Sequence, residues 1–72
     1  MSEPSRTARE WIDAFAARLG GEPPSEDVVT ALLDLAGEAA HASERTAAPI
    51  ACWMAGRAGL DPEAALALAR EV

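Results

Sequence analysis

Apolar residues recur at helical spacing in four stretches of the chain, and residues that start or stop helices bound each stretch. In the first stretch, Thr7 and Glu10 have the spacing of a capping box, and Gly20-Gly21 supplies the stop. Four apolar residues between these signals fall on one face of a helix: Trp11, Ile12, Phe15 and Leu19. The pattern therefore predicts an amphipathic helix before Gly20.

A second helix is predicted after the stiff connector Pro23-Pro24. Ser25 offers a hydroxyl to cap the helix, and the acidic residues that follow it suit the positive end of the helix dipole. Apolar side chains cover one broad side of this segment, including Leu32 and Leu33, and polar ones occupy the other. We expect this helix to end near Ala42.

The third stretch has no polar face. Ile50 to Ala55 run without a polar break, Pro49 falls in the first turn where it is tolerated, and Gly59 ends the segment. A helix that is apolar all round is typical of a buried position. This pattern predicts that the helix lies at the centre of the fold, with Trp53 and Met54 filling the space beside its small residues.

A last helix is predicted to start at Asp61-Pro62-Glu63, and no alternating β-branched pattern indicates a strand. The sequence therefore predicts an all-α fold, a compact bundle of four short helices around a central apolar helix. We expect a single domain over residues 1–72, with residues 1–6 as a frayed leader. Seven residues are predicted to form the core: Trp11, Phe15, Leu32, Leu33, Ile50, Trp53 and Met54.

Composition narrows the function classes. The chain has no lysine, and six arginines stand against twelve acidic residues, for a net charge of -6. Such a charge disfavours nucleic acid and anionic membranes as partners. The single cysteine, the absence of a secretory leader and the absence of a long apolar run favour a cytoplasmic protein. A chain of 72 residues buries a small core, so we expect binding to another protein, or a homodimer, to add stability.

One polar stripe is the candidate binding site. Asp34, Glu38, His41 and Arg45 are spaced four, three and four residues apart, which places them on one side of a helix that extends that far. Glu38 and His41 have the spacing of a ligand pair in di-iron bundles, but the chain has no second histidine to complete such a site. We therefore predict no metal, and a ligand- or metal-binding stripe remains the alternative hypothesis.

No catalytic residues are predicted. Cys52 lies within the apolar helix, where burial disfavours a thiolate, and Ser25 is explained by capping. No glycine-rich phosphate loop follows a strand, so no cofactor is expected either. These observations favour a non-enzymatic protein.

The middle of the chain carries a recognisable pattern. It consists of Leu32-Leu33-Asp34-Leu35-Ala36, Ala40-His41, Glu44-Arg45, Ala47-Ala48-Pro49 and Gly56. This pattern resembles the signature of a small uncharacterised bacterial helical domain that occurs alone or at the C-terminus of molybdopterin-guanylyltransferase-like proteins. Trp11 agrees more weakly, and the chain departs from the signature at Arg45-Thr46, where the family has Arg-Pro.

The resemblance implies an accessory or protein-interaction module associated with molybdenum-cofactor biosynthesis, with a nucleotidyltransferase as its partner. If the positions of His41 and Arg45 matter in that family, they could hold an anion, since arginine forks onto phosphates and carboxylates. Asp34 and Glu38 would repel that anion. Arg45 could equally cap the last carbonyls of the preceding helix.

Overall fold

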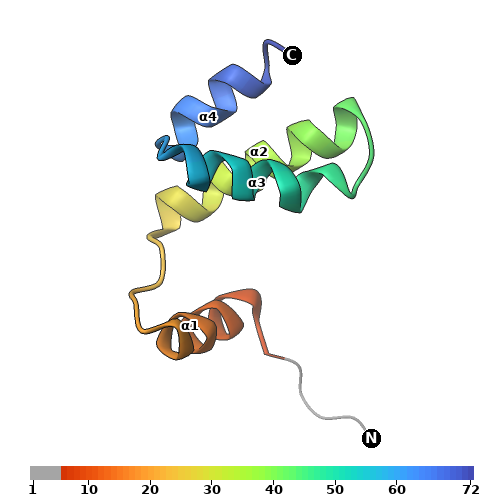
Figure 1. Cartoon of the computed structure of the whole chain (residues 1–72). Coiled ribbons are helices and arrows are strands. Elements are labelled where there is room, and N and C mark those ends of the chain that lie inside the picture. The colour runs from red at the N-terminus through yellow and green to blue at the C-terminus, as the bar shows by residue number, and fades with distance from the viewer. Residues whose placement is uncertain (1–5) are drawn as a thin grey trace, which may run out of the picture.

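The computed structural model describes residues 6–72, which form four α-helices and no strand (Figure 1). The helices are α1 (Ala8–Leu19), α2 (Glu26–Ala42), α3 (Ala47–Ala58) and α4 (Pro62–Ala69). The all-α class and the number of helices agree with the sequence prediction. Of the expected leader, residues 1–5 lie outside the described residues, and Arg6 is exposed ahead of α1.

The helix ends show the expected capping at four positions. Thr7 Oγ1 accepts a hydrogen bond from the Glu10 amide at 3.0 Å, and Glu10 Oε1 accepts one from the Thr7 amide at 2.9 Å. Ser25 Oγ accepts the Val28 amide at 3.3 Å. Gly20 and Gly59 end α1 and α3 in the left-handed conformation, with φ of 81° and 74°. Thr46 and Asp61 precede α3 and α4 without a side-chain capping hydrogen bond.

The helix at the centre of the packing is α2. It packs along both α3 and α4, whereas α3 and α4 meet each other over a shorter length. The core lies where the three helices converge, and Leu35 of α2 is its most buried large side chain, 3% exposed. Three further buried residues complete the cluster: Ala55, Ala65 and Leu66.

This arrangement corrects the prediction that the apolar helix α3 is central. Its buried and half-buried positions recur at helical spacing on the side toward α2, and they are Ala47, Ala48, Ala51, Cys52 and Ala55. Its bulky residues lie on the other sides, and Trp53 is 62% exposed. Small side chains let the axes of α2 and α3 approach closely, and a second apolar face then has nowhere to be buried.

Most of the predicted core residues are therefore outside the core. Leu32 is half-buried and packs against the core cluster, as expected. The other six are exposed: Trp11, Phe15, Leu33, Ile50, Trp53 and Met54. The core that forms instead is built of leucine and alanine, and it is small for the amount of apolar residue the chain carries.

Helix α1 stands apart from the other three, as Figure 1 shows. Within the described residues it does not pack along α2, α3 or α4. Its first turns and the first turn of α2 flank a shallow hollow, with Ile12 on one side and Val29 on the other. The rings of Trp11 and Phe15 contact each other, with centroids 5.0 Å apart, and both remain exposed. Within residues 6–72, the side of α1 that carries Trp11 and Phe15 therefore has no helix packed against it.

Among residues 6–72, every helix is too short or too polar to cross a bilayer.

Candidate functional site: an apolar groove between α3 and α4

The four residues of the predicted polar stripe do not form one site. Asp34 lines a polar hollow of about 370 Å³ between α2 and α4. The other residues around this hollow include two acids and one arginine: Asp27, Thr30, Ala31, Glu63, Leu66 and Arg70. Glu38, one turn further along α2, faces the same arginine, with its Oε1 3.6 Å from Arg70 Nε. The first half of the stripe is therefore directed toward α4.

His41 and Arg45 lie elsewhere. His41 is exposed in the last turn of α2, and Arg45 is exposed in the turn between α2 and α3. Neither residue lines the polar hollow that Asp34 lines. The stripe ends before Arg45 because α2 stops at Ala42, so the helical spacing no longer applies. No group of three His, Cys, Asp or Glu side chains within residues 6–72 is close enough to hold a metal ion.

Ser43 caps the C-terminus of α2. Capping these last carbonyls is a role that the sequence also allows for Arg45. The Ala39 carbonyl accepts hydrogen bonds from the Ser43 amide at 3.1 Å and from the Ser43 hydroxyl at 2.8 Å. Arg45 therefore has no need to satisfy this carbonyl.

The other side of α4 borders an apolar groove, which we call the α3–α4 groove. It has a volume of about 310 Å³, and Leu35 of α2 contributes to its lining. All ten residues that line it are apolar: Leu35, Ala51, Met54, Ala55, Ala58, Leu60, Ala65, Leu68, Ala69 and Val72. The groove exists because α3 and α4 both pack on α2 but contact each other only over a short length.

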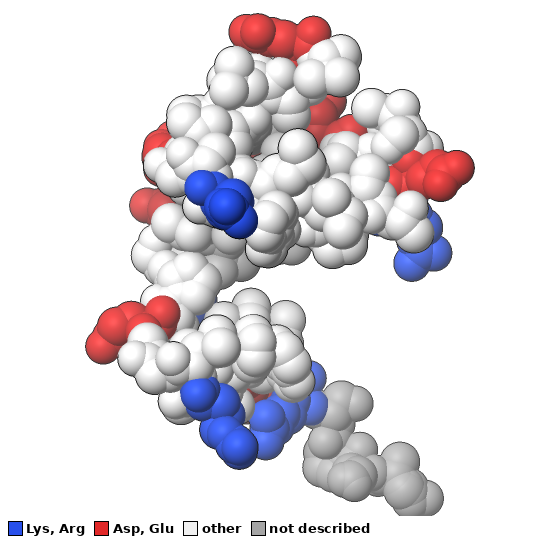
Figure 2. All heavy atoms as spheres, in the orientation of Figure 1, with Lys and Arg blue, Asp and Glu red and all other residues white. Residues whose placement is uncertain are grey.

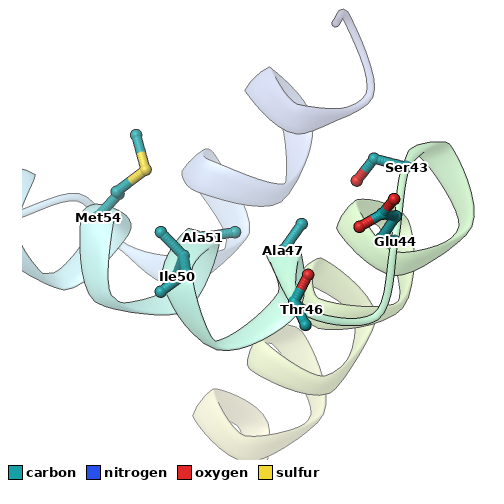
Figure 3. A pocket seen from close by; sticks show the side chains of 7 residues that line it. All are labelled: Ser43, Glu44, Thr46, Ala47, Ile50, Ala51 and Met54. Atoms are coloured by element: carbon teal, nitrogen blue, oxygen red, sulfur yellow. The ribbon is translucent and has the colours of Figure 1, made fainter.

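A second hollow adjoins this groove along α3 (Figure 3). It has a volume of about 640 Å³ and shares Ala51 and Met54 with the α3–α4 groove. Figure 3 shows Met54 at one end of it and Ser43 and Glu44, from the turn after α2, at the other. The apolar surface therefore continues along most of the length of α3.

Charged residues lie around this surface and not within it. On the face drawn in Figure 2, acidic side chains mark the edges of the body formed by α2, α3 and α4, which we call the α2–α4 body. A broad uncharged area lies between them, arginine side chains project from this body at two places, and further arginines gather on α1. Among the residues that line the two apolar hollows, Glu44 is the one charged residue. A surface of this kind offers dispersion and desolvation, with polar contacts at its rim.

The groove lacks the groups that chemistry on a substrate requires. Acid–base or nucleophilic catalysis needs a titratable side chain within hydrogen-bonding reach of the reacting atom, and the α3–α4 groove has none in its lining. Cys52 is half-buried on the inward side of α3, where its Sγ lies 3.8 Å from the Leu32 carbonyl oxygen. The lining holds no side-chain oxygen, nitrogen or thiol group, and the thioether sulfur of Met54 is its one heteroatom.

The sequence does not predict this groove, because the apolar pattern of α3 predicts an interior position for the large residues of that helix. A signal was present in the composition of α3 and α4. Both helices contain alanines at three- and four-residue spacing beside large residues such as Met54 and Leu68. An alanine face packs inward more closely than a bulky one, and it leaves the bulky residues on the walls of the groove.

Comparison with known proteins places the chain in a family without assigning a site. Neither a curated protein nor a solved structure matches it. Nearly the whole sequence, residues 3–72, matches one family, and the match takes in α1 as well as the α2–α4 body. Because this match covers nearly all of its sequence, the chain belongs to the family described as Domain of unknown function (DUF6457).

Proposed function

We propose that this domain is a non-enzymatic protein-interaction module that receives an amphipathic helix of a partner protein in the α3–α4 groove. The observation that carries the proposal is the lining of the groove, in which all ten residues are apolar. Four large residues of this lining are exposed together: Met54, Leu60, Leu68 and Val72. Grouped exposed apolar side chains of this kind commonly mark protein-interaction sites. Because acidic side chains lie at the edges of the α2–α4 body, we expect the partner helix to carry basic residues beside its apolar face.

A helix suits the groove better than a small molecule does. Small-molecule sites combine an apolar pocket with a few convergent polar groups that orient the ligand, and this lining supplies no polar side chain. Two diverging helices with a leucine between them form the kind of groove in which amphipathic helices bind through apolar residues one turn apart. The part of α3 that lines the groove runs from Ala51 to Ala58, which corresponds to about 12 Å, or roughly two turns of a bound helix.

The alternative, a ligand- or metal-binding stripe, has less support. Its four residues would have to converge on one ligand, but Asp34 and Glu38 face α4 while His41 and Arg45 are exposed beyond them. Asp34 also shares its hollow with two other acids, Asp27 and Glu63, which disfavours an anionic ligand.

The proposal is tested by changing the groove and then measuring binding to a purified partner. Proteins that co-purify with the wild-type chain from its native host are identified and produced separately. Their binding is then compared for wild type, Leu68→Glu and Trp53→Glu. Leu68 lines the groove and Trp53 does not, while both side chains are exposed, so each variant is expected to stay folded. We expect Leu68→Glu to weaken binding by at least about tenfold and Trp53→Glu to leave it unchanged.

The proposal is contradicted if the purified partner binds wild type and Leu68→Glu with equal affinity. If that binding is also lost in Arg45→Ala or His41→Ala, the site lies in the polar stripe instead. Circular dichroism of each variant shows whether a loss of binding comes from a loss of fold.

The resemblance of the middle of the sequence adds a specific partner to the proposal. Because the similar domain occurs at the C-terminus of molybdopterin-guanylyltransferase-like proteins, we propose a nucleotidyltransferase of molybdenum-cofactor biosynthesis as the first protein to test. Direct titration of such an enzyme with wild type and Leu68→Glu is the appropriate measurement. Equal binding of the two variants would separate this partner from the groove, and no binding would remove it as a partner.

A further inference from the structure

We propose that α1 of a second copy of this chain is a helix that binds in the α3–α4 groove, so that two copies exchange their N-terminal helices. This inference rests on the proposed function, because it names an occupant for the same groove. Three observations carry it: the apolar face of α1, the surface area of the chain and the distribution of charge.

The apolar face of α1 has the form that the groove accepts. Trp11, Phe15 and Leu19 are spaced four residues apart, which places them on one stripe about 12 Å long. All three are exposed, and two of them are aromatic residues of the kind that anchor interfaces. The walls of the groove are rich in alanine, with Ala51, Ala55, Ala58, Ala65 and Ala69 leaving room for such large side chains. Large residues on one surface thus meet small residues on the other.

The chain exposes more surface than a folded monomer of its size. About 4,200 Å² is expected for a mass of 7.5 kDa, and the chain exposes 5649 Å². If residues 1–5 contribute the full area of an unfolded segment, roughly 800 Å², about 4,800 Å² remains for residues 6–72. A folded monomer of that part alone is expected to expose about 4,000 Å², so the excess is still about 800 Å². A stable interface of standard size buries about 800 Å² on each partner. The excess is therefore what a dimer of this chain would cover.

The distribution of charge favours contact between α1 and an α2–α4 body over contact between the α2–α4 bodies of two copies. Residues 6–19 carry three arginines and two acids, whereas residues 20–72 carry three arginines and nine acids. The α1 segment is thus weakly positive, and the α2–α4 body has a net charge of -6 from these residues. Two bodies repel each other, while α1 is attracted to the body of either copy.

The arrangement of the chain favours a second copy over the chain's own α1. In Figure 1, α4 lies above α3 and α1 lies below it, at opposite ends of a molecule that measures 43 Å in its longest dimension. The groove between α3 and α4 is therefore far from α1 of the same chain. A single type of contact between copies covers both of the apolar surfaces that lack a partner in the described part of the chain.

The test uses two variants and their mixture. Phe15→Glu places a charge on α1, and Leu68→Glu places one in the groove; the two side chains are 48% and 52% exposed, so neither substitution disturbs a buried site. We expect wild type to associate in a concentration-dependent manner in sedimentation velocity, and each variant to associate at least about 30-fold more weakly. The mixture is expected to associate more strongly than either variant alone, because α1 of the Leu68→Glu chain still fits the groove of the Phe15→Glu chain.

Trp53→Glu is the matched control, since it introduces the same charge at an exposed residue outside the groove, and we expect it to associate as wild type does. The inference is overturned if wild type is monomeric throughout, if Phe15→Glu associates as wild type does, or if the mixture associates no better than its components. Circular dichroism identifies a variant that fails to fold, and Trp11→Ala and Met54→Ala then replace the glutamate variants. A monomeric wild type leaves the proposed function standing, because that proposal is judged by the effect of Leu68→Glu on a purified partner.

Discussion

Arg70 at the end of α4 contacts Glu38 of α2, with 3.6 Å between Nε and Oε1. The pair lies on the side of α4 that borders the polar hollow, where Arg70 also contributes to the lining. Leu68, two residues earlier, lines the α3–α4 groove on the other side of the same helix. Helix α4 therefore separates a polar hollow from an apolar groove.

The Glu38–Arg70 pair is expected to contribute little to stability. The two side chains are 39% and 60% exposed, so water and salt screen their attraction. Glu38→Gln should lower the free energy of unfolding by no more than about 1 kcal/mol, measured by urea denaturation at low and at high salt. The difference between wild type and variant should shrink as salt is added. A loss of several kcal/mol would show that the pair is a main attachment of α4.

Leu35 is expected to be the residue on which the fold depends most. It is the most buried large side chain and contacts the alanines and leucine contributed by α3 and α4. Leu35→Ala should lower the free energy of unfolding by about 3 kcal/mol or more, which for a domain this small would unfold much of the population.

Leu33→Ala is the matched control for this prediction, because Leu33 is the same residue type in the same helix but is 66% exposed. Its loss should be within about 1 kcal/mol. Thermal unfolding followed by circular dichroism ranks the two variants. Equal melting temperatures would mean that the core does not lie around Leu35.

Local sequence predicts where the helices of this chain begin and end, but helical periodicity does not predict which face of each helix packs inward. Capping residues such as Thr7 and Ser25 act on neighbouring amides, so local sequence predicts the helix ends. Which face of α3 packs inward depends on tertiary contacts with other helices. Because Ala51 and Trp53 are both apolar, the pattern does not tell which of their two faces packs against α2.

The same limit explains the outcome for the candidate site. Periodicity placed Asp34 and Glu38 on one side of α2, and both are directed toward α4. Arg45 shares this side only if the helix extends to it, but α2 ends at Ala42. The α3–α4 groove depends on how two helices diverge from a third, which no single stretch of sequence encodes.

Trp53 provides a direct test of this reassignment. If Trp53 were buried, as its apolar helix predicts, Trp53→Ala would lower the free energy of unfolding by about 3–5 kcal/mol. In the structure Trp53 is exposed and contacts Arg57, whose Cζ lies 5.6 Å from the ring centroid. Trp53→Ala should therefore lower the free energy of unfolding by about 1 kcal/mol at most.

Fluorescence quenching provides an independent measurement for the same residue. In a Trp11→Phe background, Trp53 is the remaining tryptophan, and acrylamide should quench its emission readily in the native state. Strong protection from acrylamide at low protein concentration would place Trp53 in the interior and contradict the exposed position.

Two glycines at the end of α3 are expected to respond to alanine in opposite directions. Gly56 lies within the helix, and a Cβ placed there would meet no atom within 4 Å. Gly56→Ala should raise the free energy of unfolding by about 0.5–1 kcal/mol, because alanine favours the helix and loses less backbone entropy on folding. Gly59 ends the helix with φ of +74°, and it also has open space around the position of a Cβ.

Because neither site is crowded, the difference between them is a difference in backbone conformation alone. Gly59→Ala forces a side chain into the left-handed region and should lower the free energy of unfolding by about 1 kcal/mol. The left-handed turn brings the Leu60 amide to the Ala55 carbonyl at 3.2 Å, so this hydrogen bond is also weakened if the turn changes. Urea denaturation of the two single variants measures both signs. If Gly59→Ala were as stable as Gly56→Ala, α3 would not end at Gly59 as described.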